Sequence, residues 1–325
     1  MQIPEQIAPN WYRLRIPLPD TPLKELNAYV LTGRERNLII DTGLNRDECL
    51  VAMQQGLQAL EVDLQRTDLF ITHLHADHIG LVAELATPWS TVFLNRPDTA
   101  LIRAWTGFES MIRYAVFSGF PEDQLQEGLS RHPGFHFRPK ELPELTEIRD
   151  RDTLHYAGYA LHCLSTPGHT PGHCCLYAPE PRFLLAGDHI LGDITPNIQC
   201  WSEERNPLQA YLQSLDACKE LDVALVLPGH REFVLDCPTR IQELETHHAQ
   251  RLAEILDILA QASASPFEVA SRMTWDFAAN TWEDFPMAQK WFATGEANAH
   301  LRYLEALGRI ERREQSERLV FTKPS

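Results

Sequence analysis

The sequence predicts an α/β protein whose short strands carry metal-ligating side chains at their ends. Three observations lead to this prediction. Up to about residue 240, short apolar runs bounded by turn residues alternate with stretches of helical spacing. Several of these apolar runs stop at an Asp or a His. After Cys237-Pro238 the pattern changes to long helical spacing, and two short strand-like runs follow it.

The composition is that of an ordinary globular protein, and the net charge limits the kinds of partner that we expect. With 325 residues, 44% hydrophobic and 23% charged, it can hold one large domain, or one of roughly 200–250 residues and a small one. The net charge of −16 disfavours extended binding to a nucleic-acid backbone, although a local basic patch stays open. We expect a small-molecule substrate, and a homodimer is an open alternative to a monomer.

The expected location is cytoplasmic. No run of roughly 18 apolar residues occurs, so neither a membrane-spanning helix nor a membrane partner is predicted. The stretch MQIPEQIAPNWYRL lacks the basic and apolar regions of a secretory signal peptide. The seven cysteines are an odd number, widely scattered and without a CxxC pair, which is typical of reduced thiols rather than a disulfide framework.

The N-terminal part is predicted to form strands and one helix. Asp41 follows the third strand-like run, and it is either a turn residue or a hydrogen-bond partner that fixes the tautomer of a metal-bound histidine. Apolar spacing over Asp47–Leu60 predicts a helix. The predicted strands are Trp11–Ile16, Asn27–Leu31, Asn37–Ile40, Asp68–Thr72 and Thr91–Leu94.

The stretch Ile71–Gly80, ITHLHADHIG, is the densest cluster of potential metal ligands. A predicted strand ends before it and a predicted helix, Gly80–Leu85, begins at its end, so we expect a tight loop. Three neutral imidazoles and a carboxylate directed at one point suit zinc, iron or manganese. Packing alone gives no reason to gather so many titratable groups in one loop. The potential ligands are His73, His75, Asp77 and His78.

A helical segment over about residues 97–143 interrupts the strands. Helices are predicted over Asp98–Ser118 and Asp123–Arg131. Large apolar side chains in the first helix favour a packed core, whereas its position between two ligand-bearing segments favours an active-site lid. The lid hypothesis places four side chains near a substrate, namely Trp105, Phe108, Met111 and Tyr114.

Three further ligand candidates lie at strand ends in the second half. His169 lies between two Pro-Gly turns, and Asp188 and His230 each follow a buried apolar run. Ligands at the ends of separate strands can meet at one sheet edge and build a shared site. The other predicted elements here are strands Asp152–Tyr156, Tyr159–Leu164 and Cys174–Tyr177, and a helix over Leu208–Glu220.

Together these motifs resemble those of the metallo-β-lactamase superfamily. DTG, THLHADH, TPGHTPGH, LLAGDH and LPGH occur in that order, and the resemblance covers about residues 10–240. It implies a four-layer αβ/βα sandwich with its site where the two sheets meet. We therefore expect a metal-dependent hydrolase whose catalytic domain covers residues 1–238 and contains the helical lid.

The resemblance also implies two divalent ions, expected to be zinc, with iron and manganese as alternatives. Two such ions roughly 3.5–4 Å apart lower the pKa of a bridging water and polarise a carbonyl or phosphoryl oxygen. By position, the ligands would be His73, His75 and His169 for the first ion, Asp77, His78 and His230 for the second, and Asp188 for both.

Several side chains near these ligands have expected supporting roles. Asp41 would hydrogen-bond a ligand histidine, and His173 would be a buried, hydrogen-bonded ring behind the ligands. Asp77 is the best-placed candidate for proton transfer to a leaving group, although a ligand role alone explains it equally. His189 is open between a structural role and substrate contact. The histidines expected on helix surfaces are His247, His248 and His300.

Residues 239–325 resemble a winged helix. Helices are predicted over Thr239–Gln261 and Ala297–Leu307, the second ended by Gly308. Ser265 before a proline predicts an N-capped helix that reaches Arg272. Two strand-like runs, 309–312 and 319–322, then suggest a hairpin. The stretch HLRYLEALGRIERRE resembles the C-terminal module of the β-lactamase-like protein 2 branch.

Charge argues against a nucleic-acid role for this C-terminal part. From Arg240 onward there are ten Lys or Arg and thirteen Asp or Glu, which leaves a net charge of −3. The mixed charges of the predicted hairpin are typical of a solvated surface rather than a phosphate-binding footprint. We expect a structural or dimerisation role.

Four functional hypotheses follow from the sequence. The leading one is a dinuclear metal-dependent hydrolase that uses a metal-bridging hydroxide on a small ester, thioester or lactone. An endoribonuclease of the β-lactamase-like protein 2 type is an alternative because of the winged-helix resemblance. A mononuclear-iron persulfide dioxygenase is another, because THLHADHIG also resembles that branch. The fourth is a non-catalytic protein that binds through its winged helix.

Overall fold

Two compact units, each built from discontinuous segments, make up the chain. The computed structural model describes residues 3–105, 107, 109–125, 136–137, 139, 141–276 and 281–324. Unit 1 contains residues 1–104, 136–196 and 214–241, and unit 2 contains residues 105–135, 197–213 and 242–325. The middle of the predicted lid therefore groups with the C-terminal residues in unit 2.

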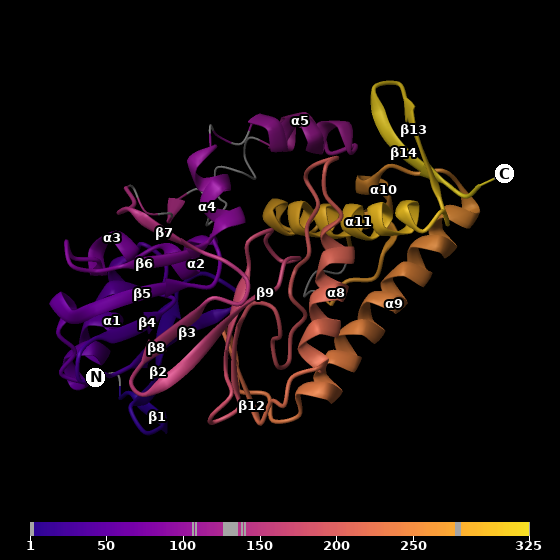
Figure 1. Cartoon of the computed structure of the whole chain (residues 1–325). Coiled ribbons are helices and arrows are strands. Elements are labelled where there is room, and N and C mark those ends of the chain that lie inside the picture. The colour runs from indigo at the N-terminus through magenta and orange to yellow at the C-terminus, as the bar shows by residue number, and fades with distance from the viewer. Residues whose placement is uncertain are drawn as a thin grey trace. The chain divides into compact units, whose positions relative to one another are not determined.

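Unit 1 is built on two β-sheets (Figure 1). The first sheet has seven strands in sequence order: β1 (Glu5–Ala8), β2 (Trp11–Leu18), β3 (Lys24–Leu31), β4 (Asn37–Ile40), β5 (Thr67–Ile71), β6 (Val92–Asn95) and β7 (Leu145–Ile148). The second sheet has five, in the order β12 (Leu225–Pro228), β11 (Phe183–Gly187), β10 (Cys174–Ala178), β9 (Tyr159–Ser165) and β8 (Thr153–Tyr156). Every strand predicted from the sequence of this unit is present, and β1 and β7 are additional.

Strand direction brings ligand-bearing strand ends together. β4, β5, β6 and β7 are parallel, so their carboxyl ends lie at the same edge of the first sheet. β11 and β12 are parallel in the second sheet, and Asp188 and His230 follow their ends. β9 and β10 are antiparallel, and the loop that joins them carries His169.

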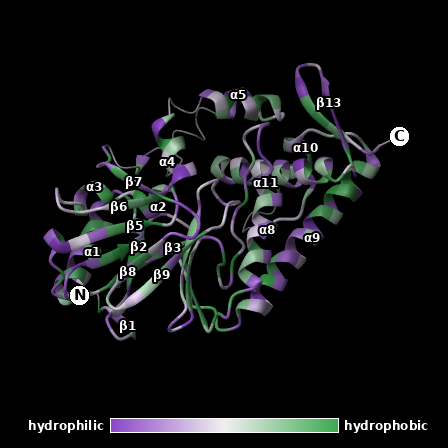
Figure 2. Cartoon of the chain, viewed as in Figure 1, coloured by the Kyte–Doolittle hydropathy of each residue, from purple (hydrophilic) through white to green (hydrophobic). Residues whose placement is uncertain are grey.

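Among the described residues, a hydrophobic core packs on each face of the first sheet of unit 1. One lies between the sheets, where Phe70 of β5 and Leu176 of β10 are both fully buried. The other covers the opposite face of the first sheet, where α1 (Asp47–Ala59) contributes Met53 and Leu57. Figure 2 shows the central strands dominated by hydrophobic residues. The result is a mixed α/β sandwich, as predicted.

Short helices connect the strands of the first sheet. They are the 3₁₀ helix η1 (Leu64–Arg66), α2 (Ala76–Ile79), α3 (Val82–Leu85) and α4 (Arg96–Arg103). The expected tight loop over Ile71–Gly80 is therefore partly helical, because α2 begins right after His75 and carries Asp77 and His78.

Unit 2 is mainly helical around its own core. It contains α5 (Glu109–Phe117), α10 (Pro266–Arg272), α11 (Met287–Ala306) and the hairpin of β13 (Glu311–Gln315) and β14 (Arg318–Thr322). Helices α8 (Pro207–Lys219) and α9 (Cys237–Gln261) have residues in both units. In Figure 2, α9 alternates between hydrophobic and hydrophilic residues along its length. Three helices followed by a hairpin were predicted; their identity as a winged helix stays a prediction.

Two sequence-based expectations about helices are wrong in detail, and a third lies mostly outside the described residues. The continuous helix over Asp98–Ser118 is two helices, α4 and α5, between which Gly107 adopts a φ of +120°. α11 begins ten residues before Ala297. Residues 122–125 are helical, but most of the helix expected over Asp123–Arg131 lies outside the described residues.

The surface placement of two histidines is also wrong. His248 of α9 is 1% exposed, and His300 is fully buried because α11 is enclosed over most of its length. His247 is half-buried.

All seven cysteines are buried free thiols. Among helices of the described residues, none is long and apolar enough to cross a membrane.

Candidate metal centre

Seven predicted ligands gather in unit 1 at the carboxyl ends of strands from both sheets. Their ligand-type atoms form three groups, each with all atoms within 4.8 Å of one another. The groups are His73, His75 and His169; His73, His78 and Asp188; and Asp77, His78 and His230. The first and third groups are the two ligand sets that the sequence resemblance implies. The remaining group contains Asp188 together with one histidine from each set.

The carboxylate of Asp188 faces both ligand sets. Its Oδ2 atom lies 3.5 Å from His169 Nε2. Its Oδ1 atom lies 3.5 Å from His78 Nε2 and 3.5 Å from His230 Nε2. One carboxylate with an oxygen toward each set has the geometry of a bridge between two ions.

Asp41 fixes the orientation of His78. Asp41 Oδ2 lies 2.8 Å from His78 Nδ1, and because an ionised carboxylate only accepts, Nδ1 carries the proton. Nε2 is then the nitrogen of His78 that faces the centre, and it can bind an ion once its own proton is displaced. Asp41 has a φ of +58°, and it also accepts hydrogen bonds from the backbone N–H and hydroxyl of Thr72. Three hydrogen bonds thus support a backbone conformation that is costly for a non-glycine residue.

The same reasoning determines which nitrogen carries the proton in two further rings. The Thr72 hydroxyl donates to Asp41, so its oxygen accepts from His73 Nδ1 at 3.0 Å. His230 Nδ1 donates to the carbonyl of Glu25 at 2.8 Å. Both histidines therefore hold an Nε2 lone pair that faces the centre, as metal binding requires.

His173 supports Asp188 instead of joining the ligands. Its Nε2 accepts the backbone N–H of Asp188 at 3.1 Å, so its Nδ1 donates to Thr166 Oγ1 at 2.8 Å. Both nitrogens are used and the ring is fully buried. Glycine is required at position 187, since a Cβ there would lie 2.7 Å from His173 Nε2 and 2.8 Å from Thr72 Oγ1.

Electrostatics separate the two ligand sets. Burial and the neighbouring ring of His169 lower the pKa of His75 to about 3, so this ring is neutral and its lone pair is available. Burial also lowers the pKa of His78, but Asp41, Asp188 and Asp77 outweigh it and raise that pKa well above the ordinary value. Burial alone would raise the pKa of Asp188. The neighbouring rings of His230 and His78 outweigh burial and lower this pKa well below its ordinary value, so the carboxyl is ionised.

The donor set fits divalent ions. Several buried polar side-chain atoms have no hydrogen-bond partner among the described residues, and four of them belong to ligand candidates and lie in this centre: His73 Nε2, His78 Nε2, His230 Nε2 and Asp188 Oδ1. Buried lone pairs without donors are costly unless something positive occupies the space between them. Imidazole nitrogens and carboxylate oxygens are ligands that zinc, iron and manganese accept.

Sequence reasoning missed Asp98. This side chain is fully buried and accepts three hydrogen bonds from the two loops that carry His73, His75 and His169. A signal was present in the sequence, because Asp98 follows a strand end of the same parallel sheet edge as Asp41 and His73. It belongs to no recognised motif, however, and was assigned to a helix of the lid.

The predicted lid residues have separate locations. Tyr114 is buried in the core of unit 2, where desolvation raises its pKa to about 12. Met111 is partly buried in a neighbouring cluster of that unit, and Trp105 is 42% exposed. Phe108 lies outside the described residues. His189 is fully buried in unit 1 and belongs to none of the three ligand groups found in the described part of the chain. A lid role stays a prediction.

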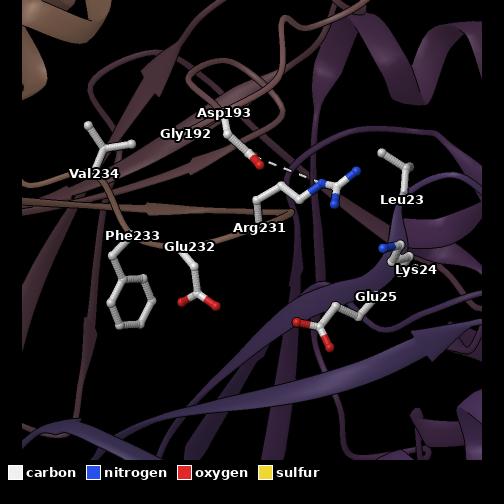
Figure 3. A pocket seen from close by; sticks show the side chains of 9 residues that line it. All are labelled: Leu23, Lys24, Glu25, Gly192, Asp193, Arg231, Glu232, Phe233 and Val234. Atoms are coloured by element: carbon white, nitrogen blue, oxygen red, sulfur yellow. Dashed lines mark ion pairs between the residues drawn. The ribbon is translucent and has the colours of Figure 1, made fainter. Parts of the chain in front are cut away.

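A pocket of about 610 Å³ adjoins the turn that carries His230 (Figure 3). None of the seven ligand candidates lines it. Figure 3 shows the Arg231 side chain extending toward Leu23 and Lys24, with an ion pair of 4.0 Å to Asp193. The lining is Leu23, Lys24, Glu25, Gly192, Asp193, Arg231, Glu232, Phe233 and Val234. The volume lies in the range of small-molecule pockets.

Several curated proteins are similar in sequence to this chain. The "Beta-lactamase-like protein 2 homolog" of Caenorhabditis elegans is 25% identical over 89% of this chain and 81% of its own length. An atrochrysone carboxyl ACP thioesterase of Aspergillus fumigatus is 24% identical over 75% of this chain, which spans only 46% of that protein. The chain likewise spans 61% of a lactamase-like protein of Aspergillus niger.

Structural similarity extends along nearly the whole chain. The crystal structure of a metallo-β-lactamase family protein of Thermus thermophilus superimposes with a TM-score of 0.83, at 29% identity, over 98% of this chain and 100% of that one. The family described as the metallo-beta-lactamase superfamily matches residues 24–230, which include all seven ligand candidates. The chain therefore belongs to the metallo-β-lactamase superfamily and is a metal-dependent hydrolase.

Proposed function

We propose that this protein is a dinuclear hydrolase of small esters, thioesters or lactones. The observation that carries the proposal is that Asp188 has one carboxylate oxygen near His169 of the first ligand set and the other near His78 and His230 of the second. The first set is His73, His75 and His169, and the second is Asp77, His78 and His230. Similarity to a protein named as a thioesterase supports the acyl-transfer class.

Two divalent ions bound there would supply an activated water and a Lewis acid for the substrate carbonyl. The chain contributes the fixed geometry. Asp41 and Thr72 hold the rings of His78 and His73, and His173 holds the backbone of Asp188. Asp77 Oδ2 lies 3.4 Å from His230 Nε2 and is 19% exposed, so it can also reach a substrate and move a proton to the leaving group.

The pocket beside His230 supports a small-molecule substrate. Its volume and its apolar and charged lining are of the kind that binds small molecules, and the seven ligand candidates lie outside it. The net charge of −16 agrees with a small substrate rather than an extended nucleic acid.

A substrate panel tests this function. The zinc- and manganese-loaded protein is incubated with thioesters, lactones and aryl esters, and in parallel with single-stranded RNA at low salt. We expect hydrolysis of at least one acyl substrate and no RNA cleavage. Cleavage of RNA with every acyl substrate left intact would refute the proposal.

An endoribonuclease of the β-lactamase-like protein 2 type is the second candidate. The similarity to the C. elegans relative favours it, since that match covers 89% of this chain. The net negative charge of the C-terminal residues argues against this candidate, because RNA is an anion. Metal analysis addresses the dioxygenase alternative, because a mononuclear-iron enzyme binds one ion per chain and the proposed hydrolase binds two.

A further inference from the structure

Asp98 is a buried carboxylate close to the metal ligands that does not belong to any ligand group of the described residues. It lies in the first turn of α4, directly after β6, and its side chain is fully buried. A buried carboxylate is costly unless hydrogen bonds compensate for the lost water. Its partners therefore show what this residue is used for.

Asp98 hydrogen-bonds to two loops from different sheets. Its Oδ2 accepts from the backbone N–H of Leu74 at 2.9 Å and from the Thr170 hydroxyl at 2.8 Å. Its Oδ1 accepts from the backbone N–H of Gly172 at 2.6 Å. Leu74 follows β5 of the first sheet, whereas Thr170 and Gly172 lie between β9 and β10 of the second.

These partners are the chain neighbours of three ligands. Leu74 lies between His73 and His75, and Thr170 directly follows His169. One carboxylate therefore ties together the backbone that carries the whole first ligand set. By contrast, the Nδ1 atoms of His78 and His230 are held by Asp41 and by the carbonyl of Glu25.

The contact is tight as well as polar. A Cβ at position 172 would lie 2.3 Å from the backbone nitrogen of Asp98 and 2.7 Å from its Cβ. Only glycine allows the His169 loop to approach this closely. Metal affinity depends on ligand positions that are held to a few tenths of an ångström, and outer hydrogen bonds supply that precision.

We propose that Asp98 is a positioning residue for the ion held by His73, His75 and His169, and that it acts on this ion rather than on the ion of Asp77, His78 and His230. The inference rests on the proposed two-metal centre. An amide in place of the carboxylate keeps an acceptor for only one of the Leu74 and Gly172 N–H groups and turns an NH₂ donor toward the other, which lets the two loops separate.

Cobalt binding tests the proposal without any substrate. Metal-free wild type and Asp98→Asn are titrated with Co²⁺, followed by visible absorption and by elemental analysis after dialysis. Wild type should hold two ions per chain. Asp98→Asn should bind one ion about 10–100-fold more weakly, with an altered spectrum for that ion only, so dialysis should leave about one ion per chain.

Asp68→Asn is the matched control. Asp68 is a buried carboxylate of the same sheet that accepts a backbone N–H from Thr91, the Tyr156 hydroxyl and the Arg36 guanidinium. It contacts no ligand loop through these bonds. Its variant should unfold at a lower temperature yet keep both ions with the wild-type spectrum. Equal loss of both ions in Asp98→Asn and Asp68→Asn would overturn the proposal in favour of general destabilisation.

Thr170→Val provides a second variant if Asp98→Asn does not fold. It keeps the side-chain shape and removes one of the three hydrogen bonds, so the first ion should weaken several-fold. Wild-type cobalt affinity and spectrum in Asp98→Asn, or in Thr170→Val where that variant alone folds, would contradict the proposal. A wild-type chain that binds two ions but hydrolyses no acyl substrate would refute the proposed substrate class and leave the role of Asp98 intact.

Discussion

Each unit of this chain contains a cluster of buried histidines, and only the cluster in unit 1 has the arrangement of a metal centre. In unit 2, His300 Nδ1 donates to the carbonyl of Glu296 at 2.8 Å, so its Nε2 accepts from His248 Nδ1 at 3.0 Å. The two rings are thus hydrogen-bonded to each other. Within this pair, only His248 Nε2 lacks a partner among the described residues.

The histidines of unit 1 differ in where their protons lie. The Nδ1 partners of His73, His78 and His230 all lie outside the centre, so three Nε2 lone pairs point inward toward Asp188. The rings of both clusters are largely buried. The outer hydrogen-bond partners and the central carboxylate make the difference, because they decide whether the lone pairs converge on one point.

Removal of a ligand should have the largest effect. His75→Ala takes one of three nitrogens from the first ligand set, and we expect loss of that ion and a fall in hydrolysis of about 10³-fold or more. Elemental analysis and the rate on the best substrate of the panel measure this. The matched change in unit 2, His248→Ala, should lower stability but keep both ions; loss of metal in that variant would break the comparison.

Asp41→Asn should sharpen the comparison, because it disturbs an outer partner and leaves every ligand in place. The amide can present its NH₂ to His78 Nδ1 and favour the wrong tautomer, so the second ion should bind about 10–100-fold more weakly. Cobalt titration measures the affinity. Asp41→Asn should weaken the second ion more than the first, because Asp41 contacts His78 directly and His73 only through Thr72, whereas Asp98→Asn should weaken the first ion more; an identical pattern in both would count against separate roles.

The pair in unit 2 should affect stability through pH. Burial lowers the pKa of His300 to about 3, below the value of roughly 6.5 in an unfolded chain. As pH falls below about 6.5, the unfolded state binds a proton that the folded state does not. The free energy of unfolding then falls by up to about 1.4 kcal/mol per pH unit for this ring.

Metal-free wild type and His300→Gln, compared by thermal unfolding between pH 5 and pH 7, measure this effect. Removal of the metal avoids a contribution from ion release at low pH. The variant should show a shallower loss of stability toward pH 5. Equal slopes for the two proteins would show that His300 is protonated in the folded state.

The smallest predicted effect lies at a helix end of unit 2. Ser265 caps α10, accepting a hydrogen bond from the Glu268 backbone N–H, while the Glu268 side chain accepts from the Ser265 backbone N–H. Ser265→Ala should reduce the free energy of unfolding by about 1 kcal/mol. Chemical denaturation measures the change, and metal stoichiometry should stay at the wild-type value.

Local features of the sequence determined much of this protein. The strands, the capped helix at Ser265 and the positions of the ligand candidates all follow from short-range patterns: apolar runs, turn residues, and His or Asp at strand ends. Such patterns are readable because a strand or a helix start depends mainly on neighbouring residues. The order of five motifs then identified the superfamily.

Only the tertiary structure decided the features that depend on contacts between distant segments. The burial of His248 against His300 and the role of Asp98 both involve partners far away in sequence. The direction of each imidazole lone pair is of the same kind, since Asp41 and Glu25 reach His78 and His230 across 37 and 205 residues. A hydrogen bond between remote segments leaves no periodic trace in the sequence, and here such bonds separate a metal centre from a buried pair of rings.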